Sequence, residues 1–407
     1  MRVFITGYGL VSAYGKSWAE LKDGFISGKN AVKYIPEWEK YKDLTSFLAA
    51  PIENYQMPEE WSRKQARSLG RVSQYSVEAS GAALKMAGFE LDNLAGIQDG
   101  YIGVACGSST GSTDAVAAMA KLLIDNDGSD VTANTYIKMM PHTTAANIAI
   151  FYGLKGRVIP TSSACTSGSH AIGYAYEAIK FGRIPMMLAG GAEELCTSEV
   201  YTFNLLYATS QKNNAPELTP APFDENRDGL VIGEGAGMLV LESEESMLKR
   251  GAKPIAEVVG FGSTCDGAHI TKPESKTMKM AMELALKDAD LSPEQIKYAN
   301  AHATATKAGD IAESIAINEL FGENICVSSL KGYLGHTLGA CGGLESIASI
   351  EMMREGEFYP NLNLKNIDPL CAKLDYLTIK RSIETQYIIK NNFAFGGVNT
   401  SLIFKKC

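Results

Sequence analysis

The chain has 407 residues, of which 45% are hydrophobic and 21% are charged. This composition excludes intrinsic disorder and collagen-like sequence, and the length predicts about two to four domains, or one large core made of two fused halves. The net charge is −8 and the 38 lysines and arginines are scattered along the chain, so we expect no nucleic-acid partner.

Cysteine usage and the apolar segments indicate a cytoplasmic protein. Eight cysteines occur without a C-x-x-C pair, so we expect neither a zinc site nor a disulfide framework. The longest segment without Asp, Glu, Lys or Arg, Val158–Tyr176, contains Pro160 and His170, so we expect no membrane span. The first residues lack the apolar stretch of a signal peptide.

Apolar strands alternate with segments of helical period along the chain, as in layered α/β proteins. In chain order, the predicted elements are a strand at Val3–Thr6 that enters a glycine turn, helices at Trp18–Ser27 and Arg71–Ala87, a strand at Tyr101–Ala105, a helix at Thr143–Tyr152, a strand at Arg157–Ser162, a helix at Thr166–Phe181 and a strand at Met186–Leu188. Three prolines and several turn formers predict a surface loop at Asn213–Asp228.

Three sequence features recur in the same order near the two ends of the chain, which predicts two duplicated α/β halves. Ile5–Gly9 corresponds to Val258–Gly262, Ser162–Cys165 to Ser328–Lys331, and Val231–Val240 to Ala394–Ile403. Each half is expected to end in a strand pair around a glycine turn. We place the boundary between residues 1–250 and 251–407.

Cys165 stands between a predicted strand and a predicted helix. The helix dipole at that position lowers the pKa of a thiol, which is typical of a nucleophilic cysteine. Small neighbours, among them Ser163 and Gly168, leave room for an oxyanion at the backbone N–H groups. We expect the other seven cysteines to be small buried hydrophobic residues.

Two of the five histidines, His302 and His336, lie in turns rich in glycine or threonine. A thiolate with two imidazoles suits carbon–carbon bond formation on thioesters, because neutral N–H donors stabilise a forming enolate. Metal binding by the pair is the competing idea, but no third ligand with helical spacing accompanies either histidine. His142, His170 and His269 are expected to be structural.

Several motifs together resemble one family, the elongating β-ketoacyl-acyl-carrier-protein synthases. The motifs are Ser163–Ser167, Gly190–Glu194, Pro222–Gly229, Glu234–Gly237, the two histidine turns and Asn392–Gly397, and the resemblance runs from Val3 to Phe404. It implies the thiolase-like fold, in which two α/β halves form αβαβα layers. It also implies decarboxylative condensation of a cysteine-bound acyl group with malonyl carrier protein, without a metal or redox cofactor.

The resemblance also implies roles for individual residues. Cys165 would accept the acyl group, and His302 and His336 would promote decarboxylation and stabilise the enolate. The backbone N–H groups of Cys165 and Phe395 would form the oxyanion hole, and Phe395 would act as a gate. The remaining implied residues are Lys331, which organises the second histidine, Glu345 in the same buried network, Thr304, Thr306, Phe393 and Thr110 at the substrate, and Asp310 as a structural acid.

The chain departs from the fatty-acid pattern near the site. Ala303 and Ala394 replace glycines, and Lys307 replaces a proline. Thr110 stands where a bulky apolar residue often closes the acyl pocket, so a different or more polar chain is one expectation; a shift of that loop by one residue is the other. These changes fit either fatty acid elongation or a specialised synthase that builds a polyketide or an aryl polyene chain.

Three rival functions remain open. A thiolase shares the fold but uses acyl-CoA and a second cysteine, which two histidines argue against. A partner subunit resembling a chain-length factor typically lacks the cysteine, which is present here. An initiating synthase of the Cys-His-Asn type would carry its asparagine at the place that the Gly335-His336 turn occupies here.

The resemblance implies an acyl carrier protein as partner and a homodimer, with a heterodimer of related subunits as the alternative. An acidic carrier protein would dock on a basic patch, for which Lys64, Arg67 and Arg71 are candidates at helical spacing. A solvated helix face explains these three residues equally well.

Overall fold

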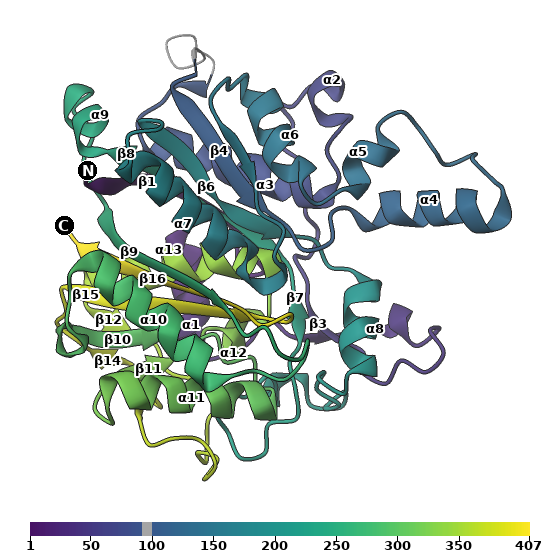
Figure 1. Ribbon diagram of the computed structural model, residues 1–407. Coiled ribbons are helices and arrows are strands. Elements are labelled where there is room, and N and C mark those ends of the chain that lie inside the picture. Colours follow the sequence, from purple (N-terminus) through teal and green to yellow (C-terminus); the bar gives the residue numbers. More distant parts are fainter. Residues whose placement is uncertain (92–99) are drawn as a thin grey trace.

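The computed structural model describes residues 1–91 and 100–407 and is built around one large sheet (Figure 1). Its eleven strands run in the order β13-β11-β10-β15-β16-β9-β1-β8-β6-β4-β5. These strands are β1 (Val3–Val11), β4 (Ile102–Gly107), β5 (Val158–Pro160), β6 (Met186–Glu193), β8 (Gly235–Ser243), β9 (Ala256–Cys265), β10 (Ile296–Asn300), β11 (Cys326–Ser328), β13 (Asp375–Tyr376), β15 (Tyr387–Ala394) and β16 (Val398–Lys406).

The described part of the chain also contains two small sheets, thirteen α-helices and several short 3-10 helices. The small sheets comprise β2 (Lys33–Tyr34), β3 (Leu48–Ala50) and β7 (Ile232–Gly233), and β12 (Glu357–Phe358) with β14 (Arg381–Ser382). The helices are α1 (Trp18–Ser27), α2 (Arg63–Ala66), α3 (Arg71–Met86), α4 (Thr113–Asp125), α5 (Thr135–Met139), α6 (Thr143–Tyr152), α7 (Ser167–Lys180), α8 (Thr197–Leu205), α9 (Glu244–Lys249), α10 (Ser275–Ala289), α11 (Lys307–Phe321), α12 (Lys331–Leu334) and α13 (Cys341–Glu355).

The two halves of the large sheet have the same strand arrangement, which confirms the predicted duplication. Strands β1 and β9 pair antiparallel in its middle. On one side follow β8, antiparallel to its neighbours, and then the parallel strands β6, β4 and β5. On the other side β16 takes the place of β8, and β15, β10 and β11 are parallel. Only β13 at the edge has no counterpart in this order.

The helices form layers around the two halves of the sheet. Helices α7 and α13 contact each other and strands of both halves, so they lie in the central layer (Figure 1). Helices α3 and α6 cover the outer face of the first half, and α10 and α11 cover that of the second. This is the αβαβα arrangement expected of the thiolase-like fold.

The glycines of the first strand do not form the predicted turn. Strand β1 continues through Gly7 and Gly9, because these glycines allow helix α3 to approach the sheet. A Cβ on Gly9 would lie 2.1 Å from the carbonyl oxygen of Ala79 on that helix. In the second half, Gly262 and the carbonyl oxygen of Ala281 on α10 repeat this contact at 2.0 Å. The repeated Gly-aromatic-Gly pattern therefore marks a helix-to-sheet contact in each half.

Two further expectations need correction. The first half does not end in a hairpin, since β7 joins the three-stranded sheet while β8 pairs with β1 and β6. The segment Asn213–Asp228 lies only partly at the surface, because Phe223 and Arg227 are buried and the Arg227 guanidinium contacts carboxylates of the second half. Among the described residues, no helix is long and apolar enough to cross a membrane.

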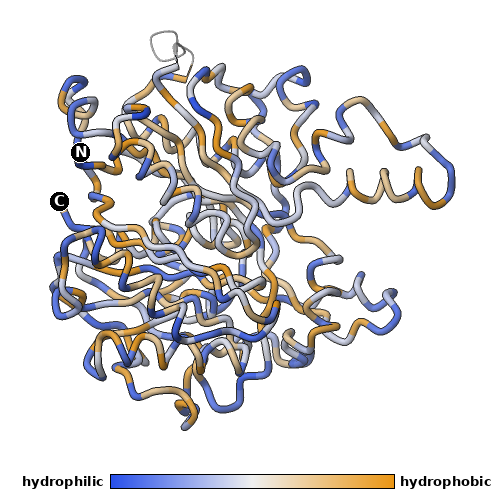
Figure 2. Tube along the Cα trace, in the orientation of Figure 1, coloured by the Kyte–Doolittle hydropathy of each residue, from blue (hydrophilic) through white to orange (hydrophobic). Residues whose placement is uncertain are grey.

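Helices α4 and α5 form an arm that projects from the body of the molecule (Figure 1). Ala115 is the one residue of α4 that is buried. Leu123 and Ile124 are each 77% exposed, and the tube along α4 is largely hydrophobic (Figure 2). Exposed apolar surface of this kind marks a contact with another molecule.

Candidate active site

Cys165 lies in the short 3-10 turn Ala164–Thr166 between β5 and α7. Ala164 has a φ of 51°, a left-handed conformation that costs energy in a residue with a side chain and is found most often at functional sites. The turn holds the Cys165 Sγ 3.0 Å from His336 Nε2. Backbone N–H groups of Phe395 and of Cys165 itself also hydrogen-bond the sulfur.

The pKa of the Cys165 thiol differs from the sequence expectation. Burial raises this pKa above its ordinary value, and the lowering effects of Lys331 and of the two backbone N–H groups do not compensate for it. The helix start alone therefore does not supply the thiolate. His336 Nε2 lies within hydrogen-bond distance of the sulfur and is placed to accept the thiol proton.

The two histidines face each other from separate loops of the second half. His302 follows β10 and His336 follows α12, and their ring centroids are 5.1 Å apart. Burial, followed by the positive charge of Lys331, holds the pKa of both imidazoles well below the usual value. Both rings are therefore neutral near pH 7. A neutral imidazole carries one N–H donor and one acceptor nitrogen.

Asn392 determines which nitrogen of His302 carries the proton. Lys390 and Ser169 both donate hydrogen bonds to Asn392 Oδ1, which fixes the orientation of the amide. Asn392 Nδ2 therefore faces His302 Nδ1, at 3.1 Å, and also contacts Cys341 Sγ. Because an amide N–H can only donate, Nδ1 of His302 accepts and its ring proton lies on Nε2.

Lys331 and Glu345 form a buried ion pair behind the histidines. Their Nζ and Oε1 atoms are 2.5 Å apart, and both residues are at most 3% exposed. A second buried lysine, Lys390, lies 3.0 Å from the other oxygen of Glu345. Burial lowers the pKa of Lys390, whereas Glu345 and other groups outweigh burial at Lys331 and raise its pKa.

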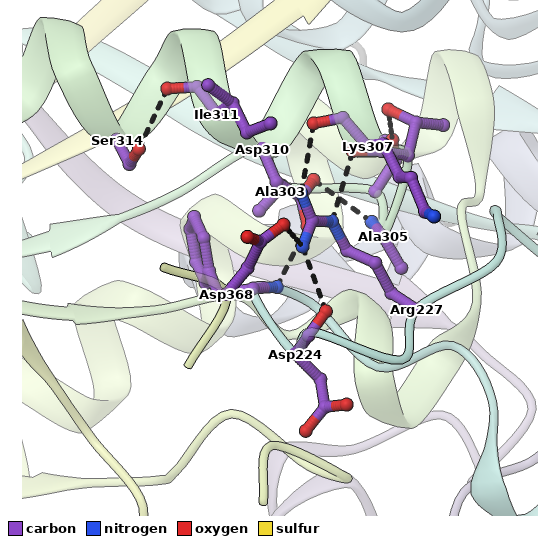
Figure 3. Close-up of polar contacts among 12 residues, drawn as sticks. Asp224, Arg227, Ala303, Ala305, Lys307, Asp310, Ile311, Ser314 and Asp368 are labelled. Carbon is purple, nitrogen blue, oxygen red and sulfur yellow. Dashed lines mark hydrogen bonds and ion pairs between the residues drawn. The ribbon is translucent and has the colours of Figure 1, made fainter. Parts of the chain in front are cut away.

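The loop after His302 is held by carboxylates and one arginine (Figure 3). Asp310 accepts the backbone N–H groups of Phe223 and Ala305 and pairs with Arg227 Nε at 3.3 Å. Arg227 also donates to the carbonyl oxygen of Lys307, the first residue of α11, and pairs with Asp368. Asp310 is thus a carboxylate that links this loop to Phe223 and Arg227.

Glu313 anchors the start of the same loop. Its two oxygens accept the backbone N–H groups of His302 and Ala303 at 2.8 and 2.7 Å. Burial raises the pKa of Glu313 to about 7 and that of Asp310 to about 6. The loop that carries His302 is therefore positioned by buried carboxylates on α11.

Two cavities meet at Cys165. The larger, of ≈ 720 Å³, is lined by both histidines and by the predicted substrate residues Thr304, Thr306 and Phe393. The smaller, of ≈ 190 Å³, is lined by Thr110. Cys165 and Phe395 line both cavities, and the Phe395 ring stacks on Phe203 at a centroid distance of 5.1 Å.

The structure brings the predicted site residues into three groups. Cys165, His302, His336 and Phe395 surround the reacting position, Lys331 and Glu345 lie behind it, and Thr304, Thr306, Phe393 and Thr110 line the cavities. The Cys165, His302 and His336 donor atoms lie within 4.8 Å of one another, which is close enough to hold a metal ion.

Five polar residues near the site were not identified from the sequence: Arg227, Lys390, Asn392, Glu313 and Glu199. A lysine and two asparagines within the apolar strand Tyr387–Ala394 were a usable signal, because an uncompensated charge is rarely buried. Arg227 lies in the motif Pro222–Gly229 and Glu313 lies in a helix, and from the sequence alone either side chain could equally be exposed to solvent. No feature of the sequence around Glu199 indicated that this residue is buried near the site.

Other predicted residues have different outcomes. His170 is buried, and its two ring nitrogens hydrogen-bond the hydroxyls of Ser163 and Ser263. These contacts fit the structural role expected of this histidine. Cys265 and Cys407 are exposed, not buried as expected, because Cys265 is the last residue of β9 and Cys407 follows the end of β16. Lys64, Arg67 and Arg71 are exposed, but they do not share one helix, since α2 ends at Ala66 and α3 begins at Arg71.

Comparison with known proteins agrees with this geometry. Family models of the beta-ketoacyl synthase N-terminal and C-terminal domains match residues 1–246 and 255–365. A 3-oxoacyl-[acyl-carrier-protein] synthase 2 of Synechocystis is 35% identical over 100% of this chain and 98% of its own length.

Solved structures show the same similarity. A beta-ketoacyl synthase from Burkholderia phymatum has a TM-score of 0.98 and 53% identity over 100% of this chain and 99% of its own. The ishigamide ketosynthase/chain length factor has a TM-score of 0.89 and 29% identity over the same shares of the two chains. With fold, sequence and cysteine–histidine geometry in agreement, the chain belongs to the beta-ketoacyl synthase family and is a condensing acyltransferase.

Proposed function

We propose that the chain elongates acyl groups by condensing a Cys165-bound acyl chain with malonyl carrier protein. The observation that supports this most directly is the contact of the Cys165 Sγ with His336 Nε2 at 3.0 Å, beside a neutral His302. Cys165 is then available as the nucleophile and His336 as the acceptor of its proton. In the second stage the two imidazoles can serve as N–H donors to an enolate. A hydrolase would need no second imidazole at this position.

The first stage is acyl transfer. The Cys165 thiol gives its proton to His336 Nε2, and the thiolate attacks the carbonyl carbon of the acyl thioester. The backbone N–H groups of Cys165 and Phe395 stabilise the oxyanion of the tetrahedral intermediate. The carrier sulfur leaves as a thiolate and takes the proton from His336, and an acyl-Cys165 thioester remains.

The second stage is decarboxylative condensation. The bond between the malonyl α-carbon and its carboxylate breaks, carbon dioxide leaves, and the electron pair forms an enolate on the thioester. Nε2–H of His302 donates to the enolate oxygen, and His336, which no longer faces a thiol proton once Cys165 is acylated, shifts its ring proton to Nε2 and donates as well. The α-carbon attacks the acyl-Cys165 carbonyl, a carbon–carbon bond forms, and the sulfur leaves as the thiolate, which takes up one proton from solvent.

The other site residues have supporting roles in this proposal. Burial keeps both histidines neutral and the charge of Lys331, paired with Glu345, adds to this effect, while Asp310 holds the loop of His302. Thr304 and Thr306, whose hydroxyl oxygens lie 3.1 Å apart in the larger cavity, would contact the pantetheine arm together with Phe393. Phe395 would open and close the connection between the two cavities.

We also infer a cytoplasmic protein that works as a dimer. The apolar arm formed by α4 and α5 is the surface we assign to a second copy of this chain, since Leu123 and Ile124 are too exposed for an isolated molecule. A related subunit, as in the paired ketosynthase/chain length factor, is the alternative occupant. The pathway would be fatty acid elongation or the building of a polyketide or aryl polyene chain.

The intact mass of the protein after exposure to acyl-carrier thioesters tests the proposal. We expect an adduct that requires Cys165, that is absent from Cys165→Ala, and that malonyl carrier protein discharges with release of carbon dioxide. His302→Ala should still acquire the acyl group but should not decarboxylate the malonyl donor. A stable adduct discharged only by acyl-CoA would instead identify a thiolase.

A further inference from the structure

The smaller cavity is the space next to Cys165 that an acyl chain would occupy. It has a volume of ≈ 190 Å³ and is separate from the larger cavity, which holds the two histidines. Part of its wall is apolar and comes from Phe203, Leu338, Phe395 and Ala164. Such walls suit a carbon skeleton, as in most ligand pockets.

Polar residues also line this largely apolar cavity, and helix α8 contributes most of them. Ser198, Glu199 and Thr202 of this helix line the cavity together with Ser109 and Thr110. A pocket that holds only a saturated alkyl chain gains nothing from these groups, because each of them must be desolvated. The presence of these polar residues therefore calls for a separate explanation.

Glu199 is the most unusual of these groups. The residue is 5% exposed, and its Oε1 accepts a hydrogen bond from the Thr110 hydroxyl at 2.8 Å. Its other oxygen, Oε2, is buried without a hydrogen-bond partner among the described residues. Buried polar atoms are nearly always paired, and an unpaired one indicates a missing partner.

The protonation state of Glu199 determines what that partner is. Burial, followed by the nearby charge of Glu193, raises the pKa of Glu199 well above its usual value and so favours the neutral carboxyl. Since Oε1 already accepts from Thr110, the proton is available on Oε2. A neutral carboxyl of this kind donates to an oxygen atom of a ligand.

We propose that Glu199, held by Thr110, selects acyl groups that carry a hydroxyl or carbonyl oxygen along the chain over saturated acyl groups of the same length. This inference rests on the proposed function, because it assumes that the acyl group on Cys165 extends into the smaller cavity. A saturated chain leaves Oε2 unpaired, whereas an oxygen-bearing chain satisfies it. Sites built to hydrogen-bond a substrate discriminate strongly against analogues without the bonding group.

The test uses hexanoyl carrier protein as the saturated probe. The oxygenated probes are its 4-hydroxy, 5-hydroxy, 6-hydroxy and 5-oxo derivatives, which place the oxygen at successive distances from the thioester. The rate of Cys165 acylation is followed by intact mass. We expect at least one oxygenated probe to react about tenfold faster than hexanoyl, since loss of one buried hydrogen bond changes a rate by about that factor or more.

Variants assign this preference to Glu199. Glu199→Leu should abolish the preference and react faster with hexanoyl, and Glu199→Gln, which remains a neutral donor, should retain most of it. If Glu199→Leu does not fold, Thr110→Val, which removes the hydroxyl that holds Glu199, should weaken the preference. Glu245→Leu, an exposed glutamate on α9, is the control and should behave as the wild type.

The outcomes separate the two proposals. If no probe acylates Cys165, the proposed function fails. If hexanoyl reacts as fast as every oxygenated probe, or if the preference persists in Glu199→Leu, the selection by Glu199 is refuted while the condensing function stands.

Discussion

Replacing Asn392 with alanine should separate the two stages of the reaction. The Asn392 amide donates to His302 Nδ1 at 3.1 Å and so keeps the ring proton on Nε2, where the enolate would need it. Asn392→Ala removes this donor and frees the imidazole to adopt the other tautomer. Acyl transfer depends on His336, which Asn392 does not contact, and should therefore change little.

The size of the effect follows from the burial of the pair. Asn392 is fully buried and His302 is 7% exposed. Removing one partner of a buried hydrogen bond costs about 1 to 3 kcal/mol, or about 5-fold to 150-fold in rate if the whole loss is felt in the transition state. We expect malonyl decarboxylation to slow within that range, measured as carbon dioxide release, while Cys165 acylation stays within about threefold of the wild type.

Asn391 offers a matched control for this experiment. It is a buried asparagine on the same strand, but its amide contacts Ser401 and Met282 on the opposite face. Asn391→Ala should therefore reduce stability without slowing decarboxylation selectively. Equal losses in both stages for Asn392→Ala, or the same selective loss in Asn391→Ala, would refute the tautomer argument.

Two further predictions concern stability. Burial raises the pKa of Glu313 from about 4.5 to about 7, so the fold favours the protonated carboxyl. The wild type should therefore lose about 3 kcal/mol of stability relative to Glu313→Gln as the pH rises from 4.5 to above 7. Chemical denaturation at pH 5 and pH 7.5 measures this loss, and parallel pH profiles of the two proteins would contradict it. Gly9→Ala should destabilise the folded protein by about 1 to 3 kcal/mol or more, because its Cβ would lie 2.1 Å from a helix carbonyl oxygen. The control is Gly128→Ala, whose Cβ would meet Leu122 at 3.4 Å. Equal melting temperatures of the two variants would argue against close packing at β1.

Local patterns were sufficient to predict much of the fold. The helices Trp18–Ser27 and Thr143–Tyr152 have the predicted bounds, since their apolar periodicity and flanking residues are clear. The duplicated order predicted the two halves of the sheet. The glycines of β1 were misread because the chain alone does not show whether a glycine serves a turn or a helix contact, and only the position of α3 decides between them.

The electrostatics of the site lay beyond local patterns. The helix start at Cys165 was visible, and it correctly marked the cysteine that lies beside two histidines. Its pKa was not predictable, because desolvation depends on the whole surrounding structure. Asn392 hydrogen-bonds His302, which is 90 residues away in the sequence, and Glu199 hydrogen-bonds Thr110, which is 89 residues away. No rule of sequence spacing connects residues at such separations.

The duplication also explains why the reacting groups meet at this point. In the repeat, Ser162–Cys165 corresponds to Ser328–Lys331, so Cys165 and Lys331 occupy equivalent strand-to-helix junctions of the two halves. The two central helices touch closely, since a Cβ on Gly342 of α13 would lie 2.2 Å from the backbone nitrogen of Ser169 on α7. In the second half, α13 begins only at Cys341, and the intervening residues carry His336 to the sulfur. One junction thus supplies the nucleophile, while the lengthened junction of the other half supplies a buried cation and an imidazole at the same place.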